Sequence, residues 1–489
     1  MTHGSPTLDA PVVEDVLEDV LEQLDVVAEG EALYAFAEAA YPLCRSITGD
    51  GVRSTLDLLV DHFFPEQLAD TRAANAHTPP LWVHEVPTGT RVLDWEVPRE
   101  WSVRGARLVA PDGTVVVDFA EHNLHLMSYS APFRGRLSFD DLRPHLFSLP
   151  ERPTAIPYRT SYYAEHWGFC LRHELLERLE AGEFGEGEYT VEIDTSLEDG
   201  SLTYGELVLP GATDEIVLLS AHICHPSLAN DNLSALAVAA RLARLLATVP
   251  RRFTYRIVFA PGTIGAITWL ARNREAVRRV RHGLVLANLG DARDAGDGPS
   301  PGAFHYKRSQ REDATVDRAV AQVLAQVSAD PAEPHEPVLE PFVPFGYDER
   351  QYCSPGFDLP VGLFSRTPWG RYPEYHTSDD DLSLLAPSAL AGSLRRLLEI
   401  VHVLETDRRY LNLQPHGEPQ LGRRGLYHHI GGGDDGRERQ LALLWVLNQS
   451  DGGASLLDIA ERSGVPYRRI LAAARALEQA ELLRPLGNL

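Results

Sequence analysis

The chain has 489 residues, of which 44% are hydrophobic and 24% are charged. This length and composition predict a globular protein of two or three domains with large cores. The formal net charge of −25 at pH 7 argues against a general role in nucleic-acid binding, because an acidic surface repels phosphate backbones. No apolar run is long enough to span a bilayer, so no membrane partner is expected.

The N-terminal residues up to Glu29 are acidic and lack the basic and apolar regions of a secretory signal. The four cysteines are scattered without CxxC spacing, which is typical of reduced thiols, and these features predict a cytoplasmic protein. Residues 32–64 predict two helices broken at Thr48-Gly49-Asp50-Gly51, since apolar residues recur at helical spacing on both sides. Residues 80–149 alternate and carry Pro and Gly turns, which predicts an inserted β-rich domain.

Residues 150–410 contain short apolar strands that alternate with amphipathic helices. This alternation predicts an α/β layered domain with a largely parallel sheet, to which residues 30–79 also belong. A linker composition follows at Gly431-Gly432-Gly433-Asp434-Asp435-Gly436. It lies in the last segment, residues 425–489, which predicts a separate unit of three short helices with Ser463-Gly464 in a helix-turn-helix turn.

Residues that can bind a metal follow one of the buried strands. The stretch LLSAHICHPSLANDNLSALAV places His222 at a strand end and Asp231 just before a long apolar helix. In open α/β sheets, ligands collect at the carboxyl ends of the strands, and histidine with carboxylate suits Zn²⁺ or another first-row divalent ion. The structural alternatives are that Asp231 caps the helix and that His222 is an ordinary strand-end histidine. His225, which precedes Pro226, could serve only the loop geometry.

Two later segments carry matching residue types. The strand GLVLANL is followed by Gly290-Asp291, a second carboxylate at a strand terminus. The loop YPEYHTSDDDL contains His376 and then three aspartates, at positions 379–381, which could alternatively supply only charge to a helix N-terminus. Four positions of ligand type in one domain favour a metal site over four unrelated structural roles.

These motifs resemble a known family. IVLLSAH…NDNLSALAVAARLARLL is similar to the strand, histidine, loop, aspartate and helix of the two-zinc aminopeptidases, EYHTSDDDL to their closing histidine loop, and LCRSITGDGVRSTLDLL to their opening helices. The whole chain resembles a bacterial group that combines an aminopeptidase-like domain, a β-rich insertion and a C-terminal winged helix. Members of that group are often labelled polysaccharide-biosynthesis proteins with an aminopeptidase-like domain.

The resemblance implies a three-layer zinc-aminopeptidase-like fold with one or two Zn²⁺ ions. By position, His222 corresponds to a ligand of one metal, Asp231 to the carboxylate that bridges two metals, and His376 to a ligand of the other. Asp291 is the nearest match for a further carboxylate ligand. His225 is a further candidate, either as a ligand or as a residue that supports the ligands.

The sequence departs from the family pattern at two places. The aspartate that usually follows the first histidine by two residues, and orients it, is Cys224 here. The glutamate pair that supplies the general base and a metal ligand is Gly262-Thr263. Glu349 is the candidate catalytic substitute, and its neighbour Asp348, a candidate ligand or supporting residue, aligns with an aspartate of the aminopeptidases. The alternative is that Asp348, Glu349 and Arg350 form a structural ion-pair cluster.

The leading functional prediction is a metal-dependent hydrolase of an amide bond, by default an aminopeptidase, with metal-activated water as the nucleophile. Its substrate would be a small peptide or an aminoacylated small molecule, for which Tyr375 and Arg366 are the candidate binding residues. The alternatives are a deacylase that acts on a small metabolite or an amino sugar, and a non-catalytic metal-binding scaffold.

A DNA-binding C-terminal unit is a weaker alternative, because five arginines balance five acidic residues from Leu441 onward, whereas DNA-binding modules are normally basic. A packing or dimerisation module is expected instead, so a homo-oligomer is left open. The β-rich insertion interrupts a domain that resumes after it, so its two ends must lie close together. It is predicted to overhang the site and restrict it to short substrates, with Asn123 and His125 facing the cleft.

Overall fold

The structure is a computed structural model that describes residues 13–65, 81–291, 293, 302–327, 330–333, 335–426 and 434–486. The chain divides into two compact units. The larger unit contains Gln23–Glu312 and His335–Arg395. The smaller unit contains Met1–Glu22, Asp313–Pro334 and Arg396–Leu489. The predicted domain boundary near residue 80 and the glycine-rich start of the predicted linker lie outside the described residues.

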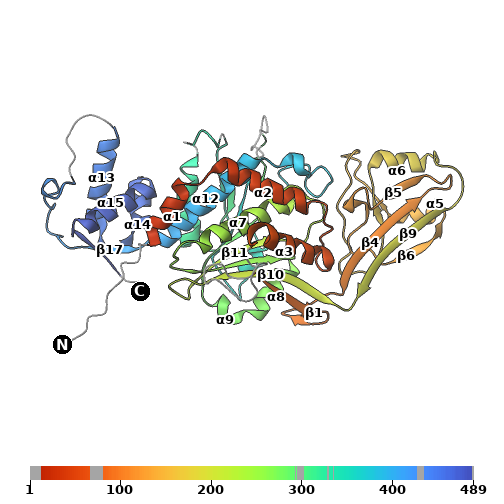
Figure 1. The fold of residues 1–489 in the computed structure, drawn as a ribbon, viewed down its shortest axis with the longest axis horizontal. Coiled ribbons are helices and arrows are strands. Elements are labelled where there is room, and N and C mark those ends of the chain that lie inside the picture. Colours follow the sequence, from red (N-terminus) through yellow and green to blue (C-terminus); the bar gives the residue numbers. More distant parts are fainter. Residues whose placement is uncertain are drawn as a thin grey trace. The chain divides into compact units, whose positions relative to one another are not determined.

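An eight-stranded mixed sheet forms the centre of the larger unit (Figure 1). Its four central strands run parallel to one another, and every residue of β11 is buried, as the continuous apolar run predicts. The outer pairings β1–β10, β10–β12 and β14–β16 are antiparallel. In spatial order the strands are β1 (Trp82–Pro87), β10 (Ser201–Leu209), β12 (Thr254–Ala260), β11 (Ile216–His222), β13 (Val280–Leu286), β16 (Val361–Ser365), β14 (His305–Lys307) and β15 (Val338–Glu340).

Helices cover both faces of this sheet (Figure 1). On one face lie α2 (Val26–Ala40), α3 (Asp50–Phe63) and α7 (Ala235–Ala247), and on the other lie α8 (Ile264–Arg272) and α9 (Arg274–Val277). The prediction of a three-layer α/β fold is therefore confirmed. Two further helices are α11 (Glu349–Tyr352), which follows β15, and α12 (Pro387–Thr406), which begins in the larger unit and ends in the smaller one.

A second, four-stranded antiparallel sheet has the order β5-β4-β9-β6. Its strands are β4 (Glu100–Val109), β5 (Val115–Asp118), β6 (Phe133–Leu137) and β9 (Tyr189–Glu198). Near it lie short elements: β2 (Arg91–Val92), β3 (Trp95–Glu96), β7 (Leu146–Phe147), β8 (Phe169–Cys170), the helices α5 (Phe139–Leu142) and α6 (His173–Glu180), and the 3-10 helices η1 (Asn123–His125) and η2 (Arg143–His145). The β-rich segment differs from the expected 80–149 at both ends, because β1 joins the main sheet and β9 pairs with β4 and β6.

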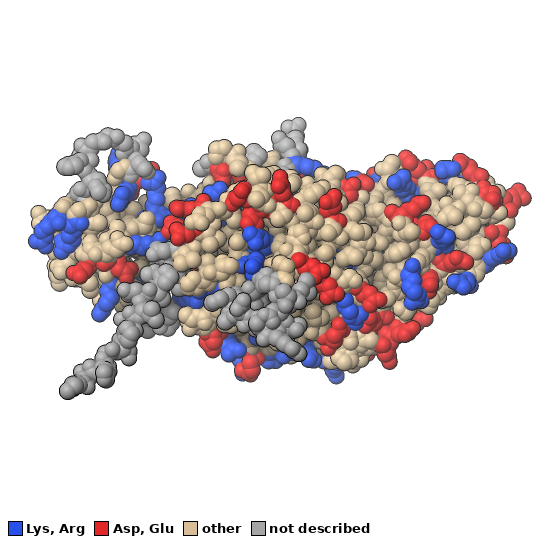
Figure 2. Space-filling view, in the orientation of Figure 1, with Lys and Arg blue, Asp and Glu red and all other residues tan. Residues whose placement is uncertain are grey.

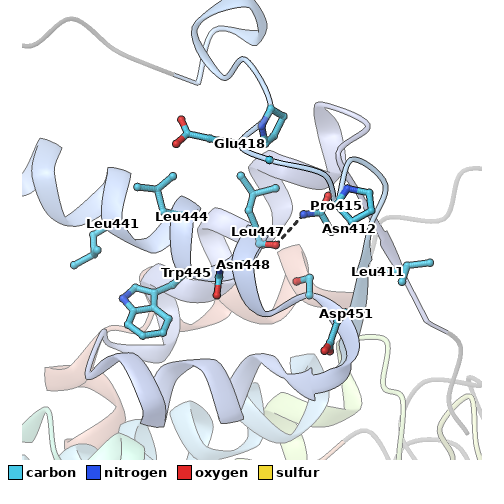
Figure 3. A pocket seen from close by; sticks show the side chains of 13 residues that line it. Leu411, Asn412, Pro415, Glu418, Leu441, Leu444, Trp445, Leu447, Asn448 and Asp451 are labelled. Carbon is cyan, nitrogen blue, oxygen red and sulfur yellow. Dashed lines mark hydrogen bonds between the residues drawn. The ribbon is translucent and has the colours of Figure 1, made fainter.

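The smaller unit carries the three predicted C-terminal helices: α13 (Asp434–Gln449), α14 (Leu456–Ser463) and α15 (Tyr467–Gln479). Gly464 ends α14 with a left-handed φ of 69°, a conformation that glycine adopts without a Cβ clash. A three-stranded sheet accompanies these helices, in the order β18 (Asp451–Ser455), β17 (Arg409–Asn412), β19 (Leu483–Pro485). The helix α13 and the chain after β17 enclose a cavity of about 790 Å³, which Leu444, Trp445 and Leu447 help to line (Figure 3).

Residues 313–334 were expected in the α/β domain, but they group with the smaller unit. They include α10 (Thr315–Leu324), whose Arg318 binds Asp458 at 2.6 Å and Glu461 at 2.5 Å on α14. The helix α1 (Val13–Glu22) belongs to the same unit, where Arg475 on α15 contacts Glu18. Across the part of the chain that the structure describes, no helix combines the length and the apolar character needed to cross a membrane.

Candidate metal centre

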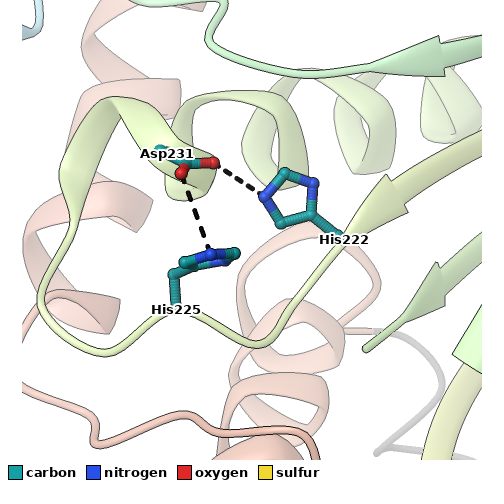
Figure 4. Close-up of side chains that lie close together, drawn as sticks. All are labelled: His222, His225 and Asp231. Carbon is teal, nitrogen blue, oxygen red and sulfur yellow. Dashed lines mark hydrogen bonds and ion pairs between the residues drawn. The ribbon is translucent and has the colours of Figure 1, made fainter. Parts of the chain in front are cut away.

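The first part of the candidate site is the turn that follows β11. The strand ends at His222, and the chain then reaches the helical turn η3 (Ala229–Ser234), where Asp231 has the non-helical angles φ −106° and ψ 83°. This irregular backbone directs the Asp231 carboxylate back toward the strand end, so that Oδ1 lies 2.7 Å from His222 Nε2 (Figure 4). The helix α7 begins only at Ala235, so Asp231 is not simply the cap of that helix.

His225 completes a compact group with these two residues. Its Nε2 lies 3.8 Å from Asp231 Oδ2, and one ligand atom from each of His222, His225 and Asp231 falls within 4.8 Å of the other two. Figure 4 shows both rings directed at the one carboxylate. The interpretation of His225 as a loop-geometry residue therefore does not account for where its side chain points.

His376 approaches the same carboxylate from the loop that precedes α12. Its Nε2 lies 3.2 Å from Asp231 Oδ2, and both atoms are buried without a hydrogen bond from the described residues. His376 has a φ of 57°, in the left-handed region that most residues avoid, and its carbonyl accepts a hydrogen bond of 2.8 Å from the Tyr158 N–H. Backbone strain of this kind clusters at functional sites, which supports a role for this ring.

The donor set fits a first-row divalent cation. Three imidazoles and one carboxylate, without a thiolate in the set, suit Zn²⁺, and the two buried atoms without hydrogen bonds would be satisfied by an ion. Burial opposes ionisation of Asp231, but the neighbouring rings of His225 and His222 hold its pKa well below the usual range. Burial also lowers the pKa of His225 well below its ordinary value, although the Asp231 carboxylate opposes that shift.

Asp380 holds the turn that carries Asp231 in place. Its carboxylate accepts hydrogen bonds from the backbone N–H groups of Asn230 at 2.6 Å and Asp231 at 3.1 Å, and Tyr372 Oη donates to it at 3.3 Å. Asn232 Nδ2 lies 3.3 Å from His222 Nδ1, on the side of the ring that faces away from Asp231. The alternative that the aspartates at 379–381 supply only helix-terminal charge therefore does not describe Asp380.

Asp291, a predicted ligand, has other partners. Its carboxylate receives hydrogen bonds from Arg293 at 3.0 Å and from Thr367 Oγ1 at 2.9 Å, and Arg293 also binds Glu374 at 2.9 Å. A guanidinium therefore compensates the charge that a metal was expected to compensate. Asn288, three residues earlier, has a φ of 55° and a buried Oδ1 without a hydrogen bond from the described residues.

Glu349, the predicted catalytic acid, forms a buried ion pair with Lys307, and burial raises its pKa. Asp348 lies closer to the histidines. A Cβ at position 262 would stand 3.4 Å from His222 Cβ and 3.5 Å from Asp348 Oδ2, so Asp348 borders the place of the missing glutamate pair. Burial raises the pKa of Asp348 to about 7, and its Oδ1 is buried without a hydrogen bond from the described residues.

Aromatic rings enclose the three histidines. Tyr375, predicted to bind substrate, stacks on His376 with 3.9 Å between the ring centroids, and Tyr347 stacks on His222 at 5.1 Å. Tyr158 meets His376 edge-on at 5.0 Å. Tyr347 and Tyr158 were not predicted from the sequence. The available signal for Tyr347 was its position directly before Asp348.

Arg366, the other predicted substrate residue, is buried beneath the sheet end. Its guanidinium donates to Ser393 Oγ at 2.9 Å and to the Gly302 carbonyl at 2.8 Å, and it lies 4.0 Å from the centroid of the Phe304 ring. These contacts give Arg366 a packing role, because its donors are directed at the interior of the larger unit.

The β-rich segment reaches the loop that carries His225 through one of the two predicted residues. Asn123 Nδ2 donates to Ser227 Oγ at 2.6 Å, two residues from His225. His125 is buried instead, with Nδ1 2.9 Å from the Cys170 carbonyl oxygen. The predicted contact of this segment with the site is therefore made by Asn123 and not by His125.

Comparison with known proteins agrees with this architecture. Residues 34–407 match a family described as a domain of unknown function, DUF4910, and residues 408–485 match a winged helix-turn-helix family. A protein of Clostridium acetobutylicum, provisionally named a polysaccharide biosynthesis protein with an aminopeptidase-like domain, is 43% identical over 93% of this chain and 96% of its own length.

Solved structures with a similar fold include two that bear on this architecture. A crystal structure from Clostridium acetobutylicum, provisionally described as a peptidase, is 40% identical and covers 96% of this chain and 100% of its own, with a TM-score of 0.84. A zinc aminopeptidase from Bacillus subtilis is 12% identical and covers 77% of this chain and 94% of its own, with a TM-score of 0.54. The chain therefore belongs to the DUF4910 family, whose domain here has a zinc-aminopeptidase-like fold and is followed by a C-terminal winged helix.

Proposed function

We propose that this protein is a zinc-dependent hydrolase of amide bonds. The observation that carries the proposal is the convergence of three histidines on the buried Asp231 carboxylate, at the carboxyl ends of the parallel central strands. The zinc-aminopeptidase-like fold supports the same assignment, since ligands collect at this edge of open α/β sheets. His222, His225, His376 and Asp231 would hold the ion.

A single ion suits this ligand set better than two. The glutamate pair of the aminopeptidases is replaced by Gly262-Thr263, which has no carboxylate, and Asp291 is bound by Arg293. His225 adds an imidazole that compensates for one lost ligand. When bound, Zn²⁺ would act as a Lewis acid that polarises a carbonyl and activates a water molecule.

Asp348 is the proposed general base, in place of Glu349. It borders the space that the missing glutamate side chain would fill, and no described residue makes a hydrogen bond to its Oδ1. Glu349, in contrast, is held by Lys307, whose ammonium also donates to the Phe345 carbonyl at 2.7 Å. A base must lie within hydrogen-bond reach of the proton it removes, or one water further away, and Asp348 meets that condition better.

A deacylase of a small metabolite is the second candidate, and the state of the nearby acids favours it. An aminopeptidase needs a carboxylate for the free amine of its substrate. Glu374 is paired with Arg293, Asp379 with Arg152, and Asp381 accepts a hydrogen bond from the Ser383 N–H at 2.8 Å. With these acids engaged, a substrate without a free amine suits the site at least as well.

The test uses the full chain, first stripped of metal with a chelator and then reconstituted with zinc. Aminoacyl-arylamides and N-acylated amino sugars are offered as substrates, which separates the two candidates. Asp348→Asn should lower the rate by about 10²–10⁴ while the zinc content stays at the wild-type level. Zinc-loaded wild-type protein that hydrolyses no amide in either panel would contradict the proposal and favour the scaffold alternative.

A further inference from the structure

A second candidate site lies at the amino-terminal ends of the strands of the main sheet, opposite the ends that carry the proposed metal centre. A cavity of about 520 Å³ opens beside α9, at the amino-terminal ends of β13 and β16. Among the described residues, four arginines line it, Arg274, Arg278, Arg281 and Arg311, and Asp358 is the one acidic residue in its wall. The chain as a whole is acidic, with a formal net charge of −25, so an excess of arginine around one cavity departs from its overall charge. Along the lower edge of the larger unit in Figure 2, near the place of α9 in Figure 1, basic side chains are mixed with acidic ones.

The charges of these arginines are only partly compensated. Arg274 forms no ion pair within the described residues, and its guanidinium lies 4.9 Å from the centroid of the Phe357 ring. Arg278 pairs with Glu275 at 3.1 Å, but the two side chains are 76% and 80% exposed. An exposed pair of this kind contributes little, so Arg278 can exchange Glu275 for a ligand at small cost.

The other two arginines are oriented by contacts that leave donors available. Arg281 contacts Glu215 through Nε at 2.9 Å, and neither of its terminal nitrogens has a hydrogen bond within the described part of the chain. Arg311 binds the Asp358 carbonyl at 2.6 Å and its carboxylate at 3.0 Å through Nη2. Its Nη1 has no such partner among the described residues. Arg281 and Arg311 are therefore oriented by the fold, and both keep donors without a hydrogen bond among the described residues.

A second arginine-lined cavity shows what a compensated site looks like. It has about 310 Å³ and lies over the β4–β9 sheet. Its three arginines face three acids: Arg104, Arg107 and Arg134 against Asp118, Glu192 and Asp194. Arg104 binds Asp194 at 2.5 Å and Arg107 binds Asp118 at 2.8 Å, so that cavity has no net charge to offer an anion.

We propose that the cavity beside α9, the arginine pocket, binds a small phosphorylated molecule. Guanidinium groups recognise phosphate oxygens through paired, charge-assisted hydrogen bonds, and several guanidiniums around one cavity suit a group with many anionic oxygens. The arginine pocket is not part of the metal centre. It lies at the start of β13, whereas the ligands lie past the strand ends, and seven strand residues span about 23 Å. Occupancy of the pocket therefore does not depend on the proposed hydrolase activity.

Inorganic pyrophosphate is the probe, and its binding to the full chain is measured by calorimetry at low salt. The double variant Arg274→Gln/Arg278→Gln alters two exposed side chains and should weaken binding by about tenfold or more. Arg104→Gln, in the compensated cavity, is the matched control and should leave the affinity unchanged. Asp231→Asn removes the carboxylate at the centre of the proposed metal site and should also leave the pyrophosphate affinity unchanged. This variant distinguishes binding in the arginine pocket from binding to a metal ion at the other site.

Acetate should bind far more weakly than pyrophosphate, since one carboxylate cannot engage several guanidiniums. Pyrophosphate that binds the double variant as tightly as wild type would overturn the proposal, and so would binding that disappears in Asp231→Asn. The phosphate assignment also fails if acetate binds equally well, or if wild type binds no pyrophosphate.

Discussion

Asp380 accepts a hydrogen bond of 3.1 Å from the backbone N–H of Asp231, although the two residues are 149 positions apart. The same carboxylate receives the N–H of Asn230 at 2.6 Å. The turn that carries Asp231 and the loop that carries His376 are therefore joined in two ways. The Asp380 carboxylate binds backbone N–H groups of the turn, and the His376 ring approaches the Asp231 carboxylate. The Asp380 contact ties together these two segments of the proposed metal site.

The first prediction concerns this contact. Asp380→Ala removes the acceptor for two successive N–H groups and frees the Asp231 turn to move. Loss of such an orienting partner typically lowers metal affinity by about 10–100-fold. Zinc affinity, measured by competition with a chromogenic chelator, should fall by that factor.

Asp381→Ala is the matched control, because Asp381 is adjacent in sequence but accepts its hydrogen bond from the Ser383 N–H at 2.8 Å. It should retain wild-type zinc affinity. Equal losses in the two variants would mean that the loop as a whole, and not the Asp380 contact, determines binding.

The second prediction concerns His225 as a ligand. If its ring binds the ion, His225→Ala should weaken zinc binding at least as much as loss of an orienting partner does, about 10–100-fold. His173→Ala is the control, because that half-buried histidine lies at the start of α6 and contacts Ser148 at 2.9 Å. Unchanged zinc stoichiometry and affinity in His225→Ala would leave His225 as a neighbour of the site only.

The positions of His222 at a strand end and of Asp231 before a helix could be predicted from the sequence, because the apolar patterns of the strand and the helix mark where each element ends or begins. His376 was a candidate by residue type, and the family resemblance assigned it to the same site. The Asp380 hydrogen bonds across 149 and 150 positions, which join its loop to the Asp231 turn, are not visible in a sequence pattern. For His225 the sequence left a ligand, a supporting residue and a loop residue open, because the direction of its ring depends on the path of the loop.

Asp291 and Glu349 illustrate what the sequence could not determine. Beyond the end of a strand, a shift of one residue turns a side chain to the other face, and Asp291 is directed to Arg293 while Asn288 lies three residues nearer the strand. Glu349 and Asp348 are adjacent and chemically alike. Which of the two faces the histidines depended on Lys307, which comes from β14, a strand elsewhere in the sheet.

The third prediction follows from the Lys307–Glu349 pair. Glu349→Gln leaves a lysine that is only 8% exposed without its carboxylate partner, and breaking a buried pair this way costs about 3–5 kcal/mol. The free energy of unfolding in urea should fall by that amount, with zinc content unchanged in the folded protein. Lys307→Met/Glu349→Met removes both charges and should recover most of the loss. A double variant as unstable as the single one would contradict the ion-pair role.

The last prediction concerns acid stability in the smaller unit. His402 is 1% exposed on α12, and burial lowers its pKa to about 4, with Arg475 and Arg468 adding to the shift and Glu18 opposing it. The unfolded chain binds this proton near pH 6.5, so protonation favours unfolding. The contribution of neutral His402 is fully present above pH 6.5 and is lost as the pH falls toward 4, at about 1.4 kcal/mol per pH unit. His402→Gln should therefore reduce the loss of Tm between pH 7 and pH 5, whereas His416→Gln, at an exposed position, should leave that loss unchanged. The assignment is wrong if the two variants show the same pH dependence.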